Sequence, residues 1–443
     1  MKASRKNFAT ARIISCSPDK NMLVKKLQLT NFRNYPEALV NFSPGRNIIT
    51  GENAQGKTNL LEAIEYAARG KSHRTSSDWE LIKRTSSSAN LALDIVTGDY
   101  DETITVGWKT KAERLSDGRS SVERLLHING VKKSSSRDLL GHLVAVSFNS
   151  QDLNLLRGGP KFRRDWIDDI VSILNRSYSA NLARFQKSVT QKNRLLKTLF
   201  EKGRRMTVED QSQLKVWDQQ VALYGAQIIK QRVAYLYQVL PIAERYQSLM
   251  SGSSEKLSLS YDMRTSSRQS DDDDSDSAQS DMDAPPVASG ALSSDDLLRI
   301  EETELQERMI ATFKKSRWEE IARKQTLSGP HRDDLRLSIN SLDATTYASQ
   351  GQQRTLVLSL KLAELALVKE HLEEPPVLLL DDVMAELDLT RQGFLMASVD
   401  QDMQTIITTT HLDGFKDEWL QGASFITVSD GVVKEGTLCR GSA

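Results

Sequence analysis

The chain has little of three features that would assign it to particular classes of protein. It has two cysteines in 443 residues, Cys16 and Cys439, one near each end. This scarcity argues against a disulfide framework or a cysteine metal cluster and favours a reducing, cytoplasmic location. No apolar run approaches the ~20 residues that a membrane-spanning helix needs, so no membrane association is expected. No helix-turn-helix or zinc-finger spacing is present, which argues against sequence-specific DNA binding.

An excess of one charge is also absent. The sequence has 59 Lys and Arg against 59 Asp and Glu, which gives a formal net charge of zero. A DNA-binding protein needs a basic face rather than a basic total, so this balance does not exclude nucleic acid. The length of 443 residues is enough for two domains and a large core.

A phosphate-binding loop is the most specific local motif. Residues 51–58 read GENAQGKT and match the pattern GxxxxGK[ST]. An apolar run at 47–50 leads into the loop, and a helix-like stretch at 59–69 follows it, with Gly70 well placed to end that helix. Glycines let successive backbone N–H groups face one anion, and the helix N-terminus adds a partial positive charge.

We therefore predict that this loop binds the phosphates of a nucleotide together with Mg²⁺. Lys57 is expected to reach the β- and γ-phosphates and to take part in catalysis, and the Thr58 hydroxyl is expected to hold Mg²⁺. A chance glycine-rich turn is the alternative, which the flanking strand and helix patterns oppose. The predicted nucleotide contacts from this loop are Gly51, Glu52, Asn53, Ala54, Gln55, Gly56, Lys57 and Thr58.

Two adjacent carboxylates follow an apolar run near the other end of the chain. Four apolar residues at 377–380 are typical of a strand that is buried on both faces of a parallel sheet. Asp381 and Asp382 come next, and burying them without a partner would be costly. We assign Asp381 to the Mg²⁺ shell and Asp382 to the general base, or to positioning the attacking water. Asp382 as a plain helix cap is the alternative.

Between these motifs lies a third string. Residues 348–354 read ASQGQQR, and an amphipathic helix is predicted from about 355 to 371. The string resembles the signature motif of the ABC ATPase superfamily, and its departures from LSGGQ match the RecF branch. The resemblance implies that Ser349, Gly351 and Gln352 of one subunit meet the γ-phosphate of ATP held by the opposite subunit. A Gln- and Ser-rich helix start is the alternative.

Two shorter marks agree with this superfamily. The segment 386–388 resembles the D-loop that crosses the dimer interface, so Asp388 is included among the predicted nucleotide contacts. A β-branched strand is predicted at 405–410, and His411 ends it. By its position, His411 resembles the switch histidine that contacts the γ-phosphate, and an ordinary structural histidine is the alternative.

The resemblance to the RecF family, which belongs to the SMC-like ATPases that act on DNA, extends over most of residues 22–414. It implies that Arg33 and Asn34 lie near the nucleotide, and that Arg74 reaches phosphate or stabilises the dimer. It also implies a Q-loop near residues 149–152, in which Gln151 senses Mg²⁺. Ordinary surface residues are the alternative in each case. The resemblance is carried, besides the motifs above, by the strings at 27–35, 70–75, 158–164 and 329–334.

The predicted fold class is α/β. We expect an ABC/SMC-type P-loop ATPase head, with a mixed sheet, flanking helices and an antiparallel β subdomain, into which an α-helical arm is inserted. Residues 1–21 are predicted to be a disordered basic extension, with a transit peptide as the alternative. The remaining predicted units are the first half of the head at 22–155, the arm at 156–324 with a disordered acidic insert at 251–296, and the second half of the head at 325–443.

The helical arm is the predicted place for DNA. Its cations could contact phosphates without reading sequence, although a solvent-exposed helix normally carries such residues too. The candidates are Lys187, Lys192, Arg194, Lys197, Lys202, Arg204 and Arg205.

The family resemblance implies one function, and the core motifs alone allow another. The first is an ATP-dependent homodimer that binds DNA at single-strand gaps or junctions and hydrolyses ATP slowly. With RecR and RecO, it would help load recombinase in recombinational repair and the SOS response. The second is the ATPase subunit of a membrane transporter. The long arm and the strings SQGQQRT and GPHRDD oppose the second reading.

Overall fold

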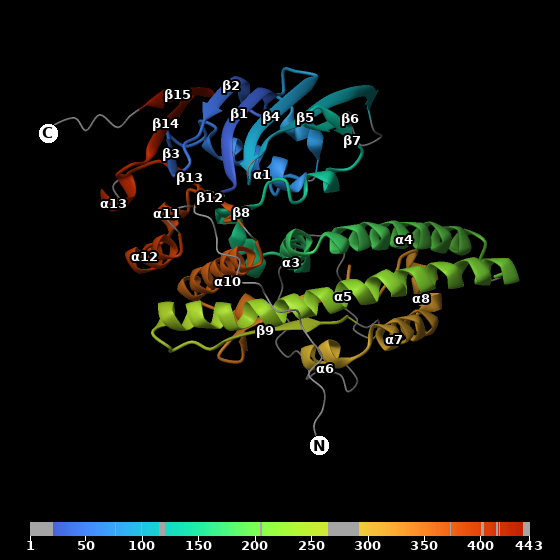
Figure 1. The fold of residues 1–443 in the computed structure, drawn as a ribbon. Helices are drawn as coiled ribbons and strands as arrows, with labels where there is room; N and C mark the ends of the chain where they lie inside the picture. The colour runs from blue at the N-terminus through green and yellow to red at the C-terminus, as the bar shows by residue number, and fades with distance from the viewer. Residues whose placement is uncertain are drawn as a thin grey trace.

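The structure is a computed structural model with two β-sheets at one end and a helical layer at the other (Figure 1). The predicted extension up to residue 20, residues 265–291 of the predicted insert, and Arg204 and Arg205 lie outside the described part of the chain. The described residues are 21–75, 77–98, 100–114, 120–203, 206–264, 292–372, 374–399, 403–412, 415 and 417–436.

The first sheet is antiparallel and has the strand order β2-β1-β4-β5-β6-β7. Asn129 and Gly130 join its last two strands with φ values of 50° and 77°, the left-handed conformation that a tight Asn-Gly hairpin turn requires. The predicted antiparallel subdomain is thereby confirmed. Its strands are β1 (Leu23–Phe32), β2 (Tyr35–Asn41), β4 (Ser88–Thr97), β5 (Tyr100–Arg114), β6 (Ser120–Ile128) and β7 (Val131–Lys133).

The second sheet is mixed and has the order β15-β14-β3-β13-β12-β8, with β15 alone antiparallel to its neighbour among these strands. Val377–Leu380 is buried throughout, as predicted for a strand covered on both faces. In the register of the sheet, Asp381 lies between Thr408 and Asn149, so three strand ends meet there. The strands are β3 (Arg46–Thr50), β8 (Ala145–Asn149), β12 (Val377–Asp381), β13 (Thr405–Thr409), β14 (Ser424–Ser429) and β15 (Val432–Gly436).

Helix α1 (Lys57–Arg69) packs against strands of both sheets, and its second and third turns are almost entirely buried. Gly70 ends the helix with φ 70°, in the conformation predicted for a glycine C-cap. Two acidic residues of this helix, Glu62 and Glu65, are only 0% and 3% exposed. Because a buried carboxylate is costly without a partner, both residues require cationic or hydrogen-bonding partners.

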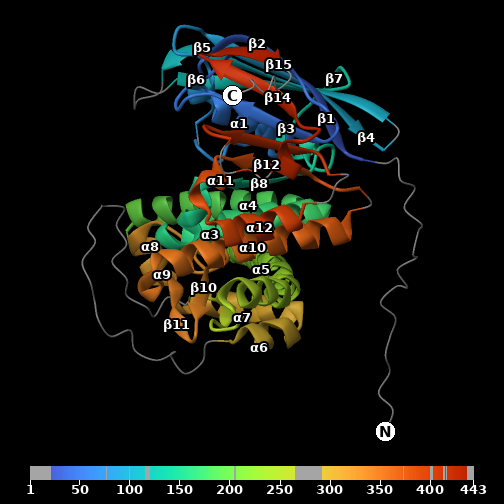
Figure 2. The same ribbon diagram turned by 90° about the vertical axis from the view of Figure 1, so that its left-hand side faces the viewer.

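The helical layer is built around α5 (Val208–Ser251), a 44-residue helix that begins at a capping box on Thr207. Helix α4 pairs with α5 to form the arm, and α10 packs along α5 toward the sheets (Figure 2). The other helices are α2 (Asn154–Arg157), α3 (Pro160–Leu174), α4 (Arg176–Glu201), α6 (Ser294–Arg299), α7 (Glu302–Lys315), α8 (Arg317–Arg323), α9 (Ala344–Tyr347), α10 (Gln350–His371), α11 (Val383–Glu386), α12 (Leu389–Ala397) and α13 (Asp417–Leu420). Short 3-10 helices lie at η1 (Asp78–Leu81), η2 (Ser136–Leu139) and η3 (Ser150–Leu153).

The predicted disordered insert is wrong at both of its edges. Strand β9 (Leu257–Asp262) and helix α6 fall inside the predicted range 251–296. Leu257, Leu259 and Tyr261 alternate with polar residues and are buried, which is the pattern of a half-buried strand. The Ser- and Asp-rich composition of 251–296 favoured disorder, and the alternation of apolar and polar residues in β9 was therefore not recognised as a strand.

Not all of the predicted second half of the head, 325–443, lies in the parallel sheet. Strand β10 (Asp334–Ile339) pairs with β9 and with β11 (Leu342–Asp343) in a separate three-stranded sheet. After the long helix α10, which packs along α5, the chain returns to the parallel sheet at β12.

One predicted DNA contact is wrong. Lys192 is 0% exposed, and its ammonium group forms ion pairs with Asp218 at 3.0 Å and Glu320 at 2.9 Å. A side chain held in this way has no access to a DNA phosphate. Within the part of the chain that the structure describes, every helix is too short or too polar to span a membrane.

Candidate functional site

The phosphate-binding loop has the backbone that its glycines permit. A Cβ atom on Gly51 would lie 2.3 Å from the carbonyl oxygen of Val428, and one on Gly56 would lie 2.5 Å from the Asn34 amide. Gly56 has φ 116° and stands at the N-cap of α1. Among the described residues, no side chain caps this helix N-terminus, and its first turn has no acidic residue. The first N–H groups are therefore suited to an anion.

Two turns brace the loop from outside. The Asn34 amide donates to the Gln55 carbonyl at 2.9 Å, and the Tyr35 hydroxyl donates to the Gly56 carbonyl at 2.9 Å. From the turn between β14 and β15, the Asp430 backbone N–H donates to the Gln55 side chain at 2.5 Å. Asn34 thus contacts the loop itself. Sequence reasoning gave no role to Tyr35, the last residue of the string 27–35, and missed Asp430, which lies outside every motif. The predicted contacts Glu52, Asn53 and Ala54 are exposed at the loop tip.

Lys57 places its ammonium group inside the loop. The group donates to the carbonyl oxygens of Gly51 at 2.6 Å and Glu52 at 2.8 Å. Burial lowers the pKa of Lys57, while Asp382 and Asp381 act to raise it. The lysine therefore lies within electrostatic reach of both carboxylates, as the sequence motifs predict for a shared phosphate and metal site.

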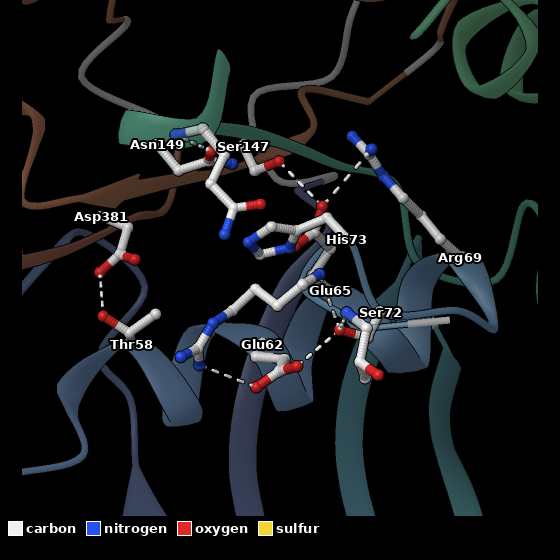
Figure 3. A network of polar contacts seen from close by, with 12 residues as sticks. Thr58, Glu62, Glu65, Arg69, Ser72, His73, Ser147, Asn149 and Asp381 are labelled. Carbon is white, nitrogen blue, oxygen red and sulfur yellow. Dashed lines mark hydrogen bonds and ion pairs between the residues drawn. The ribbon is translucent and has the colours of Figure 1, made fainter. Parts of the chain in front are cut away.

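Thr58 and Asp381 meet although 323 positions separate them. The Thr58 hydroxyl donates to Asp381 Oδ1 at 2.9 Å (Figure 3), and the Thr408 hydroxyl donates to the same oxygen at 2.7 Å. A hydroxyl and a carboxylate are ligands that Mg²⁺ accepts, with water and substrate phosphates completing the shell. The pair fits an ion held together with a nucleotide. The described residues bring together no group of three His, Cys, Asp or Glu side chains that would hold a metal without one.

Asp382 stands beside this pair in a strained backbone conformation, with φ 55°. It occupies the N-cap position of α11, yet within the described residues its side chain makes no capping hydrogen bond. Its Oδ1 atom is buried and has no hydrogen-bond partner among the described residues. Burial raises the pKa of Asp382, Lys57 lowers it, Asp381 raises it and His411 lowers it, with a net rise. The Asp382 side chain therefore does not cap α11 through a hydrogen bond to the described residues, and its role as a general base stays a prediction.

His411 and Gln151 follow the two strands that flank β12. His411 is exposed, influences the Asp382 carboxyl electrostatically, and donates its backbone N–H to the Thr409 hydroxyl at 3.3 Å. Gln151 is exposed in η3, and its backbone N–H donates to the Asn149 side chain at 2.9 Å. Asn149, rather than Gln151, lies in register with Asp381. An amide at the carboxyl end of a strand was the signal that sequence reasoning missed.

The predicted signature residues begin helix α10. Ser349 and Gln352 form a reciprocal capping box, with bonds of 2.9 and 3.3 Å, and Gly351 is exposed beside them. Arg391 donates to the Gly351 carbonyl at 3.0 Å and forms an ion pair with Asp388. The structure therefore joins the predicted signature and D-loop residues of one chain on an exposed surface.

The predicted nucleotide contacts Arg33 and Arg74 both bind Glu62 of α1. Arg33 donates through Nε at 3.0 Å and Nη2 at 2.5 Å, and Arg74 donates through Nη1 at 3.1 Å. Their side chains remain 17% and 32% exposed. Sequence reasoning missed Glu62 because an acidic residue in a helix is commonly a surface residue.

Comparisons with known proteins agree with the motifs. A family model described as RecF/RecN/SMC N terminal domain matches residues 23–429. A DNA replication and repair protein RecF from Cyanothece sp. is 37% identical over 420 residues, which cover 94% of this chain and 99% of that protein. The RecF protein of Synechocystis sp. is 38% identical over 417 residues, covering 94% and 98%.

A solved structure extends the agreement to three dimensions. It is described as the recombination mediator protein RecF with ATP in the RecFOR pathway. It matches with a TM-score of 0.76 and 31% sequence identity, over 94% of this chain and 98% of that chain. The predicted fold class is confirmed, and the relatives favour a DNA-repair protein over a transporter subunit. The chain belongs to the RecF family of the SMC-like ABC ATPase superfamily.

Proposed function

We propose that this chain is an ATP-dependent homodimer that binds DNA at single-strand gaps and junctions without sequence specificity. It hydrolyses ATP slowly and in a DNA-dependent manner, so that hydrolysis acts as a timer for release. By family membership, its partners are RecR and RecO, and its role is to help load recombinase in cytoplasmic recombinational repair and the SOS response.

The proposal rests on one observation: within one chain, the predicted phosphate and metal residues lie on other elements than the predicted signature residues. Thr58, Asp381 and Asp382 gather at the carboxyl edge of the sheet, beside the loop that carries Lys57. The predicted signature residues instead begin a helix that packs along α5, with Ser349 exposed. An exposed signature is available to a second copy, which makes a composite site between two copies the arrangement that these positions favour.

The roles of the residues follow from their chemistry. Bound MgATP supplies the phosphoryl group and the charge that the site is built to hold. Lys57 and the α1 N-terminus bind phosphate oxygens, and Thr58 and Asp381 hold the ion. Asp382 accepts a proton from the attacking water, and His411 contacts the γ-phosphate. Ser349 and Gly351 of the second copy close the site, so that nucleotide binding and dimerisation are linked.

DNA contacts are assigned to the exposed cations of α4. Lys187, Arg194 and Lys197 are exposed, whereas Lys202 is paired with Asp210 at 2.9 Å. Lysines and arginines on a helix face bind phosphates through charge, which gives affinity without sequence preference.

The test is the mass of the protein in solution, measured by light scattering with MgATP, with ADP, and with MgATP plus gapped duplex DNA. We expect a dimer with MgATP that also takes up DNA. The Ser349→Arg variant, which places a bulky cation at the proposed contact, should bind ATP and stay monomeric. A wild type that remains monomeric with MgATP and ignores gapped DNA would contradict the proposal.

A further inference from the structure

Glu62 is the centre of a polar cluster on the face of α1 next to the nucleotide site. It is 0% exposed and stands one helical turn after Thr58 (Figure 3). Its two oxygens accept four hydrogen bonds: two from Arg33, one from Arg74, and one from the Ser72 hydroxyl at 2.5 Å. Glu62 thus joins the turn between β1 and β2 to the segment that follows α1.

A second set of contacts connects this cluster to the phosphate-binding loop. Arg74 Nη1 donates to the Asn59 side-chain oxygen at 2.6 Å, and the Asn59 amide donates to Asn34 at 2.8 Å. Asn34 in turn donates to the carbonyl of Gln55 in the loop at 2.9 Å. The position of Arg74 is therefore coupled by an unbroken series of hydrogen bonds to the backbone of the loop.

The charges of the cluster do not balance. Among the described residues, one carboxylate holds two guanidinium groups, which leaves one positive charge in excess in this cluster. A purely structural tie needs a single cation, since the second adds repulsion without adding a partner charge. Both arginines also keep part of their surface exposed, at 17% and 32% of the side chain. The excess charge therefore remains available to an anion beside the loop.

We propose that Glu62 is a positioning residue for the nucleotide site. It holds the guanidinium groups of Arg33 and Arg74 beside the phosphate-binding loop, with one positive charge in excess, so that the site favours a nucleoside triphosphate over a diphosphate. This inference rests on the proposed ATP-binding function. A triphosphate carries more negative charge than a diphosphate, and a fixed cation distinguishes them by that difference.

The test compares two buried carboxylates of the same helix. Glu65 stands one turn after Glu62, is 3% exposed, and pairs with His73 and with Arg69 at 3.4 Å. Binding of ADP and of a non-hydrolysable ATP analogue, each with Mg²⁺, would be measured by calorimetry for the wild type, Glu62→Gln and Glu65→Gln. Thermal unfolding without nucleotide would be recorded for all three proteins.

We expect Glu62→Gln to lower the ratio of analogue affinity to ADP affinity by roughly tenfold, because the arginines lose their fixed place. Glu65→Gln should reduce thermal stability to a similar degree and leave the ratio within about twofold of the wild type. An unchanged ratio in Glu62→Gln, or an equal fall in both variants, would overturn the positioning role alone. A wild type that binds neither nucleotide would overturn the proposed function itself.

A milder variant keeps the test decisive if Glu62→Gln fails to fold. Ser72→Ala removes one hydrogen bond to Glu62 and the hydroxyl that accepts from the Arg74 and Thr75 backbone N–H groups, and it changes no charge. We expect it to lower the same affinity ratio by roughly two- to threefold. A folded Ser72→Ala protein with the wild-type ratio would count against Glu62 as the residue that fixes the two arginines.

Discussion

The carboxyl edge of the parallel sheet and the base of the helical arm both bury charged side chains, but they satisfy them to different degrees. At the sheet edge, Asp382 has φ 55° and a buried oxygen with no hydrogen-bond partner among the described residues. At the arm base, Arg232 donates to Asp168 at 2.8 and 3.0 Å and to the Pro330 carbonyl at 2.7 Å. A strained, partly unpaired charge indicates chemistry, whereas a saturated one indicates structure.

Asp382→Asn gives the largest expected effect and tests the first half of this comparison. Removing the proposed base should slow ATP hydrolysis by about 10² to 10⁴-fold, because proton transfer from water loses its acceptor. The unfolding temperature should stay the same or rise, since a desolvated charge is removed. Steady-state hydrolysis and thermal unfolding of the same preparation measure both quantities. A variant that loses stability but keeps its hydrolysis rate would reverse the assignment.

Asp168→Asn tests the second half of the comparison, the saturated charges at the base of the arm. It leaves Arg232, which is 2% exposed, without its carboxylate, and the free energy of unfolding should fall by roughly 3–5 kcal/mol. Below its unfolding temperature the variant should bind MgATP as the wild type does. Denaturant unfolding measures the loss. The matched control is Asp165→Asn on the same helix. Asp165 forms an ion pair with Lys161 at 3.1 Å, and the Lys161 side chain is 76% exposed. That change should cost less than about 1 kcal/mol, and equal losses would contradict the comparison.

Asp333 gives a smaller, pH-dependent effect at the arm base. Burial raises the pKa of Asp333 to about 6, although the Tyr261 hydroxyl, Arg232 and the Arg264 backbone N–H act to lower it. Because this folded-state pKa lies above the ordinary 3.8, the folded protein favours the protonated carboxyl. Its contribution to stability is present below about pH 4 and is lost as the pH rises to about 6, amounting to roughly 2–3 kcal/mol.

The difference in unfolding free energy between the wild type and Asp333→Asn isolates this group from others that titrate in the same range. Measured from pH 4 to pH 7, the wild type should lose stability relative to the variant as pH rises. A difference that does not change with pH would show that the buried Asp333 carboxyl has an ordinary pKa.

The residues of the phosphate-binding loop were predictable because their requirements are local. A loop that wraps an anion needs glycine where the backbone takes a positive φ, as Gly56 does at 116°, and those positions are fixed by spacing along the chain. The apolar run at 377–380 likewise predicts a strand that is buried on both faces. Strand β9 was missed, although its alternation was present, because the surrounding composition resembled a disordered segment.

The partners of the charged residues were not predictable in the same way. Lys192 was expected on the surface because long cations usually are. Only the packing of α4 against α5 gives it Asp218, and only the packing of α4 against α8 gives it Glu320. Arg33 and Arg74 were expected near the nucleotide, and the structure adds the buried Glu62 that holds both. An ion pair between segments that are distant in the chain produces no periodic pattern in the sequence of either segment, so the sequence does not reveal it.

The sequence by itself determined the phosphate-binding loop, the two carboxylates after their buried strand, and the signature string, since each depends on residues that are neighbours in the chain. Only the tertiary structure decided that the Thr58 and Thr408 hydroxyls donate to the same oxygen of Asp381, and that Glu62 forms ion pairs with two arginines. The physical reason is that strand ends meet only when a parallel sheet forms, and a buried charge obtains its partners only when the elements carrying them pack together.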